Sequence, residues 1–270
     1  MIRAVRPLAG AACLVLAAAC GVVPKAPLVS PSDLASSPQD LLGRLAGDES
    51  RLTSVRGLAT VLYRGAAGSG SALQAIVVAP PDRARLETLS PIGTTLLVLT
   101  IRGDDLRVHS LIRHEYGEGR ATRETLGRLA KVPLPPEPLV RLLAGLPPLP
   151  LRLDDPRVRT SRGPGTVQVD SVDGAFWQQL WTGPDGSVDH GVLGDATGPL
   201  LRFQFADRQA LEHTSFPFEI RLEETTASAT LIIRYQKVRL NLPVEADLFE
   251  LPRPTDGQTR ILDLEGGPRP

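Results

Sequence analysis

Apolar and polar residues alternate with a period of two along much of the chain. Before residue 114 the alternation covers 55–63, 71–79, 83–88, 94–101 and 106–113. It resumes in 166–172, 176–182, 187–193, 200–205, 218–224 and 229–240. A period of two is typical of half-buried strands, and the short connections leave no room for crossover helices. The pattern therefore predicts a series of antiparallel hairpins.

Three short segments have helical spacing instead. Pro38 follows Ser37 at an expected helix start, and we expect this helix to end near Gly47. The segments 122–129 and 137–143 are flanked by prolines. Their apolar positions are Leu126, Leu129, Leu139, Leu142 and Leu143. The predicted fold class is mainly β with short helices (α+β), in which one antiparallel sheet curves around an apolar interior and the helices cap it.

The N-terminus has the features of an export signal. Arg3 and Arg6 precede an apolar run, 8–19, which is too short to cross a bilayer as a helix. Small residues lead into Cys20 and resemble a bacterial lipobox, although Ala17 stands where such boxes usually carry Leu. We expect a signal peptide over 1–19 and acylation of Cys20, the alternative being an ordinary secretory signal with a chance cysteine.

The remaining boundaries follow from composition. Proline and serine are frequent in 20–36, as in an extended tether between the acylated residue and a folded domain. We expect the domain over 37–255 and a frayed tail over 256–270, which is rich in Gly, Pro and charge. Gly21 stands where Asp would signal retention, so resemblance to lipoprotein sorting implies localisation to the bacterial outer membrane.

Charge and composition exclude several classes of function. The chain has 30 basic and 30 acidic residues, so it lacks the basic excess of a nucleic-acid-binding protein. The 25 prolines argue against a coiled coil or a long helical bundle. Two cysteines are too few for a disulfide framework or a cysteine-built metal site.

Candidate catalytic residues do not form a recognisable motif. The four histidines are dispersed without metal-ligand spacing: His109, His114, His190 and His213. His190 follows Asp189, but no nucleophile in a suitable turn accompanies them. Gly117 and Gly119 lack the third glycine of a dinucleotide fingerprint, and Asp154-Asp155 precedes a proline as a solvated turn would. We therefore expect no enzyme activity, no cofactor and no metal.

One stretch resembles a known family. Residues 85–99, RLETLSPIGTTLLVL, look like the strand–loop–strand segment of the outer-membrane lipoprotein receptor LolB. Residues 124–135 and 139–147, with a Gly-Leu-Pro exit, resemble its two lid helices, and the similarity extends over about 83–155. The run 235–252 is closer to the wider LolA/LolB-like superfamily, whereas 156–230 match only as a strand pattern.

The resemblance implies an open antiparallel β-barrel whose helical lid covers an apolar cavity for acyl chains. It implies that Pro91, Ile92 and Gly93 form a protruding tip that delivers cargo into the bilayer, the alternative being that Ile92 folds back onto a neighbouring contact. It also implies that the five leucines named above belong to the lid, although lining a cavity and filling a core require the same residue types.

The resulting hypothesis is a monomeric outer-membrane lipoprotein that accepts acylated lipoproteins from a LolA-like periplasmic carrier and inserts them into the outer membrane. A second hypothesis is a module that binds another amphiphile, such as a glycolipid. A third is a structural envelope lipoprotein, which predicts a filled interior without a cavity under the helices.

Overall fold

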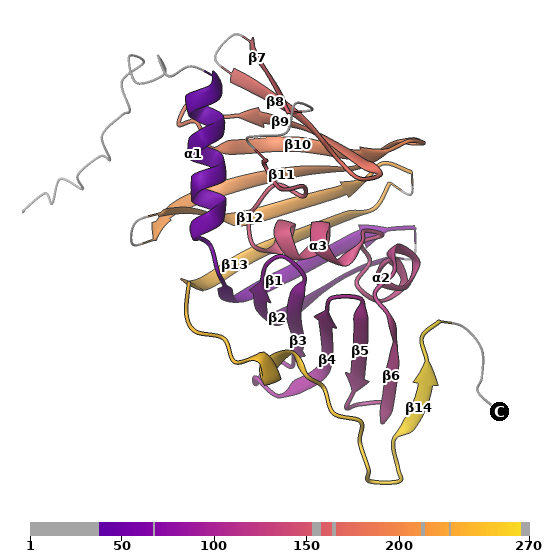
Figure 1. Ribbon diagram of the computed structural model, residues 1–270. Coiled ribbons are helices and arrows are strands. Elements are labelled where there is room, and N and C mark those ends of the chain that lie inside the picture. The colour runs from indigo at the N-terminus through magenta and orange to yellow at the C-terminus, as the bar shows by residue number, and fades with distance from the viewer. Residues whose placement is uncertain are drawn as a thin grey trace, which may run out of the picture.

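One continuous sheet is the framework of the protein. The computed structural model describes residues 38–66, 68–152, 158–163, 166–211, 214–226 and 228–265. Within these residues, 14 strands form a single open sheet in the order β14-β6-β5-β4-β3-β2-β1-β13-β12-β11-β10-β9-β8-β7 (Figure 1). This confirms the predicted class of an open, curved and mainly antiparallel β structure with short helices.

The elements have the following bounds. The strands are β1 Val55–Gly65, β2 Gly68–Ala79, β3 Arg83–Leu89, β4 Thr95–Arg102, β5 Asp105–Ser110, β6 Glu115–Arg120, β7 Arg159–Gly163, β8 Thr166–Asp173, β9 Phe176–Thr182, β10 Val188–Asp195, β11 Gly198–Leu211, β12 Thr214–Glu224, β13 Thr230–Leu240 and β14 Arg260–Asp263. The helices are α1 Pro38–Arg51, α2 Arg123–Leu129, α3 Pro136–Leu143 and the short 3₁₀ helix η2 Ala246–Phe249.

The two halves of the sheet meet where β1 pairs with β13. The pairing runs antiparallel from Val55 opposite Leu240 to Arg64 opposite Thr230. On one side of this seam lie β1–β6, joined by short hairpin connections, and on the other lie β7–β13. The helices α2 and α3 stand between the two halves in sequence, and α3 lies beside the seam (Figure 1).

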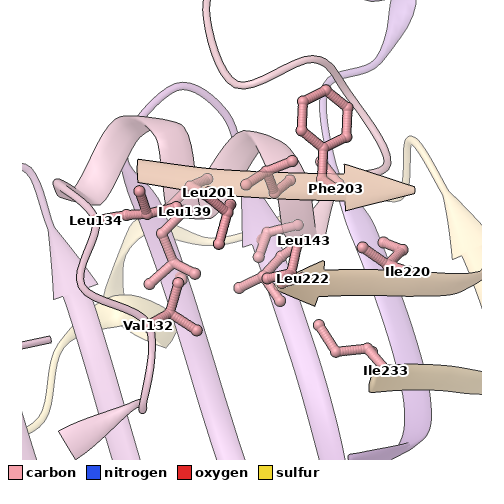
Figure 2. Packing of buried hydrophobic residues seen from close by; sticks show 14 of the residues in the cluster. Val132, Leu134, Leu139, Leu143, Leu201, Phe203, Ile220, Leu222 and Ile233 are labelled. Atoms are coloured by element: carbon pink, nitrogen blue, oxygen red, sulfur yellow. The ribbon is translucent and has the colours of Figure 1, made fainter. Parts of the chain in front are cut away.

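The apolar interior lies between the helices and one face of the sheet. Leu139 and Leu143 of α3 pack among side chains of β11–β13, including Leu222 and Ile233 (Figure 2). Alternation explains this arrangement, because every second residue of a strand points to the same face. The opposite face of β3–β6 is covered by the C-terminal segment, where Leu251 packs with Val98 and Tyr116.

Two predicted boundaries are wrong. Helix α1 does not end near Gly47 but continues to Arg51. A glycine inside a helix costs only about 1 kcal/mol, and here the Ser50 hydroxyl donates to the Gly47 carbonyl at 2.8 Å. The expected frayed tail over 256–270 also contains strand β14, which pairs in parallel with β6. The composition of the tail did not predict β14, because this strand forms by pairing with β6, which is distant in the sequence.

Candidate functional site

An apolar cavity of about 350 Å³ lies between the helices and the sheet. Its walls come from β1–β4 and β13 and from the segment that runs from the end of α2 to α3. Apart from Ser71, the strand residues on its wall follow the two-residue period: Val61, Tyr63, Gly70, Ala72, Gln74, Ile76, Leu86, Thr88, Leu97, Leu99, Leu231 and Ile233. Each strand therefore contributes the side chains of its inner face.

The five leucines assigned to the lid divide into two groups. Leu129, Leu139 and Leu143 line the cavity. Leu126 and Leu142 are fully buried and belong to the core without lining the cavity. In α3, Leu139 and Leu143 lie one helical turn apart and both line the cavity, whereas Leu142, next to Leu143 in sequence, packs into the core.

Helix ends fix the position of the lid. The Thr122 hydroxyl accepts a hydrogen bond from the Thr125 amide at 3.2 Å and caps α2. Proline begins α3, where an amide hydrogen would have no partner within the helix. The connection between the two helices adds Ala130, Lys131 and Val132 to the cavity wall.

The exposed members of the wall mark where the cavity opens. Gly70 and Ser71 at the start of β2, together with Leu129 and Lys131 at the end of α2, are exposed to solvent. Lys131 is the single charged residue among the described residues of the wall. The interior is otherwise apolar apart from hydroxyl groups and Gln74, whose amide donates to the Thr88 hydroxyl at 3.4 Å.

The predicted delivery loop connects two strands of this wall. Ile92 is 90% exposed, and Pro91 and Gly93 are exposed beside it. Ser90 closes the loop, because its amide donates to the Thr94 carbonyl at 2.8 Å and its carbonyl accepts from the Gly93 amide at 2.9 Å. Gly93 has φ +86°, a conformation that favours glycine. Ile92 thus does not fold back onto a neighbouring contact.

The loop and the cavity are adjacent along the sheet. Thr88 pairs with Leu97 across the β3–β4 hairpin, and both residues line the cavity. Only Leu89 separates Thr88 from the loop that begins at Ser90. The apolar tip and the apolar cavity are therefore parts of the same end of one hairpin.

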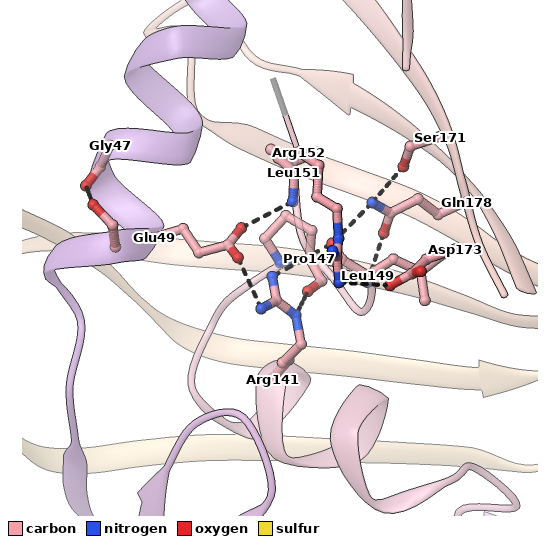
Figure 3. Close-up of polar contacts among 11 residues, drawn as sticks. Gly47, Glu49, Arg141, Pro147, Leu149, Leu151, Arg152, Ser171, Asp173 and Gln178 are labelled. Atoms are coloured by element: carbon pink, nitrogen blue, oxygen red, sulfur yellow. Dashed lines mark hydrogen bonds and ion pairs between the residues drawn. The ribbon is translucent and has the colours of Figure 1, made fainter. Parts of the chain in front are cut away.

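A buried ion pair holds α3 against α1. The Arg141 guanidinium, 4% exposed, lies 2.8 Å from the Glu49 carboxylate (Figure 3). Its Nε donates to the Pro147 carbonyl at 2.8 Å, so the charge is paired and hydrogen-bonded. Gln178 of β9 continues the network by accepting from the Leu149 amide at 2.9 Å. The network ties the lid to the second half of the sheet.

Residues considered for other chemistry are dispersed. His190 lies 3.0 Å from Asp189 in an exposed pair and stacks on Trp181, while His109 contacts the ring of Tyr116 edge-on. Among the described residues no group of three His, Cys, Asp or Glu side chains could hold a metal ion.

Several predicted features lie outside the described residues. These are Cys20, His213, Asp154 and Asp155. The acylation of Cys20 therefore stays a prediction. No helix in the described ranges is long and apolar enough to span a membrane.

Solved structures with the same architecture identify the fold. A protein of the DUF1329 family from Desulfovibrio piger matches with a TM-score of 0.57 and 11% identity, over 79% of this chain and 95% of that one. A putative outer membrane lipoprotein-sorting protein domain from Vibrio parahaemolyticus has a TM-score of 0.55 and 13% identity, over 79% and 97%. A LolA superfamily protein from Nitrosomonas europaea has a TM-score of 0.51 and 12% identity, over 80% and 99%. The chain shares the fold of these structures.

Sequence comparisons add no closer assignment. No protein-family model matches the chain, and no curated protein sequence matches it significantly. The shared fold agrees with the expectation of a curved sheet under a helical lid.

Proposed function

We propose that the protein binds the acyl chains of lipid-modified proteins in the cavity under α2 and α3 and transfers them to the outer membrane, as a LolB-like receptor does. The observation that carries the proposal is the apolar cavity, which opens to solvent beside α2 and borders the exposed Ile92 loop. An acyl chain requires such a site because it offers no hydrogen bonds and gains only from leaving water.

The energetics suit a carrier that catalyses no reaction. Each methylene removed from water contributes about 0.8 kcal/mol, so a partly enclosed chain is held strongly. Transfer from a LolA-like periplasmic carrier to this cavity and then to the bilayer is spontaneous if each successive environment binds the chain more tightly. No cofactor or nucleotide is needed for such a sequence.

Acylation at Cys20 would keep the receptor at its target membrane. Two or three acyl chains anchor a protein durably, and 17 residues separate Cys20 from Pro38, the first residue of α1. A monomer satisfies the proposal, since the cavity is built from one chain.

A matched pair of substitutions tests the cavity. Ala72 and Ala75 both belong to β2, but Ala72 lines the cavity and Ala75, an odd number of residues away, faces the other side of the sheet. Ala72→Phe is expected to weaken binding of a polyene fatty acid that fluoresces in apolar surroundings, whereas Ala75→Phe leaves binding unchanged. Equal affinity of the two variants for the fatty acid would contradict the proposed site.

A second experiment tests transfer. Ile92→Glu is expected to impair insertion of a carrier-bound lipoprotein into liposomes, and Val172→Glu, which alters an exposed apolar residue on β8, serves as the control. Mass spectrometry of the lipids and proteins that co-purify with the full chain identifies the cargo. Recovery of free glycolipid without any lipoprotein would overturn the transfer function.

A further inference from the structure

We propose that the β5–β6 turn carries a second apolar tip, Leu111 and Ile112, which enters an anionic phospholipid bilayer beside Ile92. The proposal deepens the proposed function, because it rests on the protein working at a membrane surface. It assigns membrane contact to an edge made of two loops instead of a single loop.

Exposure singles out this edge. Five large hydrophobic residues are exposed in the described part of the chain, and three belong to these two loops. Ile92 is 90% exposed, Ile112 65% and Leu111 43%. The other two, Leu129 and Val172, are each 38% exposed. Side chains of this size exposed in a group, at connections that polar residues could have made, indicate an interaction surface.

The strand register places the two loops side by side. Leu97, just after the Ile92 loop, pairs with Ser110, just before the β5–β6 turn. The Leu111 amide also donates to the Leu96 carbonyl at 3.0 Å. Because β4 and β5 are antiparallel neighbours, both connections extend from the same edge of the sheet, which is the lower edge in Figure 1. Neighbouring strands are about 4.8 Å apart, so both tips can reach one plane.

The shape of the edge favours a bilayer over a protein. A stable protein interface needs roughly 800 Å² of matched surface on each partner. Here narrow hairpin turns project separate aliphatic side chains instead of presenting a continuous face. Such tips are suited to a deformable medium, into which each side chain can enter separately.

Charge around the second tip points to anionic lipid. Arg113 follows Ile112, is exposed, and has no acidic partner among the described residues. The two acids nearby are already engaged: Glu115 pairs with Arg260, and Asp256 accepts hydrogen bonds from the Gln258 and Thr259 amides at 3.0 Å each. At membrane interfaces, a cationic side chain often stands next to an aliphatic side chain that enters the bilayer, and the cation contacts the lipid headgroups.

A local probe tests the contact. The full chain carries Cys13→Ser and Cys20→Ser, which exclude acylation, together with Ile112→Cys labelled with an environment-sensitive fluorophore. The control label is placed by Asp105→Cys, which lies at the β4–β5 turn on the opposite edge. With vesicles of phosphatidylcholine and phosphatidylglycerol, we expect emission at position 112 to shift to shorter wavelength and a quencher on the lipid chains to reduce it, with no change at position 105.

Three additional substitutions test the cooperation of the tips and the contribution of charge. In the chain labelled at position 112, Ile92→Glu is expected to raise the lipid concentration for half-maximal quenching about tenfold, and Val172→Glu to leave it unchanged. Arg113→Glu is expected to raise it on anionic vesicles and to have little effect on neutral ones.

Each remaining outcome is decisive. Absence of quenching at position 112, or equal quenching at positions 105 and 112, would overturn the second tip. A spectral shift that depends on protein concentration and needs no lipid would show a contact between copies and overturn it as well. The fatty-acid test with Ala72→Phe is independent of this one. If Ala72→Phe does not weaken fatty-acid binding while quenching at position 112 is retained, the cavity function is contradicted and the membrane contact stands.

Discussion

The two halves of the sheet pack against the same helices with different kinds of side chain. Strands β1–β6 contain no phenylalanine or tryptophan, and Tyr63 is the single aromatic residue in the described cavity wall. Strands β9–β12 carry five of the six phenylalanines of the chain. Phe203 lies 5.2 Å from Phe205 between ring centroids, and Phe216 lies 5.3 Å from Tyr235. Aromatic rings therefore pack together in the second half of the sheet, whereas the cavity under α2 and α3 borders mainly the aliphatic first half.

The difference shows how one sheet can be both rigid and hollow. Aromatic rings occupy a large volume with few rotatable bonds, so the second half of the sheet holds α3 through packing and through the Tyr235 hydroxyl, which donates to the Leu143 carbonyl at 2.8 Å. The first half faces the other side of the same lid and leaves space there. A filled interior, expected of a purely structural lipoprotein, is therefore not what lies beneath α2 and α3.

The largest expected effect is on stability, from truncating a buried ring in the aromatic half. Phe205 is 1% exposed, so Phe205→Ala should lower the free energy of unfolding by about 3–5 kcal/mol. Leu129→Ala, at the cavity mouth, should cost less than about 1 kcal/mol because the side chain is already partly exposed. Chemical denaturation measures both, and similar losses would remove the distinction between the halves.

Added volume should also destabilise the aromatic half more than the cavity wall. A methyl group at Gly194 would lie 2.1 Å from a ring atom of Trp177 and 2.7 Å from the Gly198 carbonyl oxygen, so Gly194→Ala should destabilise by about 1–3 kcal/mol. Ala72→Phe adds an entire ring next to the cavity and should cost less than Gly194→Ala. Thermal unfolding of the two variants compares them, and a greater loss from Ala72→Phe would show that the cavity cannot accept volume.

The third prediction concerns alkaline pH. Burial raises the pKa of Tyr235 above its ordinary value of 10.0, so the folded protein holds the phenol proton more tightly than the unfolded chain does. The contribution of the protonated Tyr235 side chain to the free energy of unfolding is fully present below pH 10 and is lost as the pH rises above that value. Tyr235→Phe should lose about 1 kcal/mol at pH 7, with the difference from the parent chain vanishing near pH 11. Denaturant midpoints at both pH values measure it, and a constant difference would contradict the assignment to Tyr235.

The smallest effect is expected at the cavity mouth. Lys131→Glu should weaken binding of a fatty-acid anion a few-fold, because the charge at the mouth changes sign, while Lys131→Arg should preserve it. The uncharged methyl ester of the same acid is the control ligand. If the ester is affected as strongly as the acid, the lysine acts through packing and not through its charge.

Sequence patterns predicted most strands but not the β5–β6 turn. The alternation continues through Leu111 and Ile112, so 106–113 resembles one strand, whereas β5 ends at Ser110. β6 was missed because Gly117 and Gly119 weaken the strand pattern. Side chains at both positions would meet Leu264, which packs over them, so the glycines are explained by a contact 145 or more residues away.

The cavity was predictable only in part. The spacing of the lid leucines was clear in the sequence, but whether a leucine lines a space or fills a core depends on the opposing side chain. Leu126 and Leu142 differ from Leu129 and Leu143 only in that respect. The contribution of Lys131 and Val132 depends on the path of the connection between α2 and α3, for which the local sequence contains no periodic signal.

The β1–β13 seam has a consequence for how the chain reaches its native state. Val55 pairs with Leu240, so the central ladder joins segments about 185 residues apart and cannot begin until nearly all of the chain is available. Each half consists mainly of hairpins between neighbouring strands, which close short loops and form early. We expect slow folding governed by the docking of two hairpin arrays, with exposed edges at β1 and β13 until they meet. A chain exported from its N-terminus onward would require protection of these edges until β13 has followed.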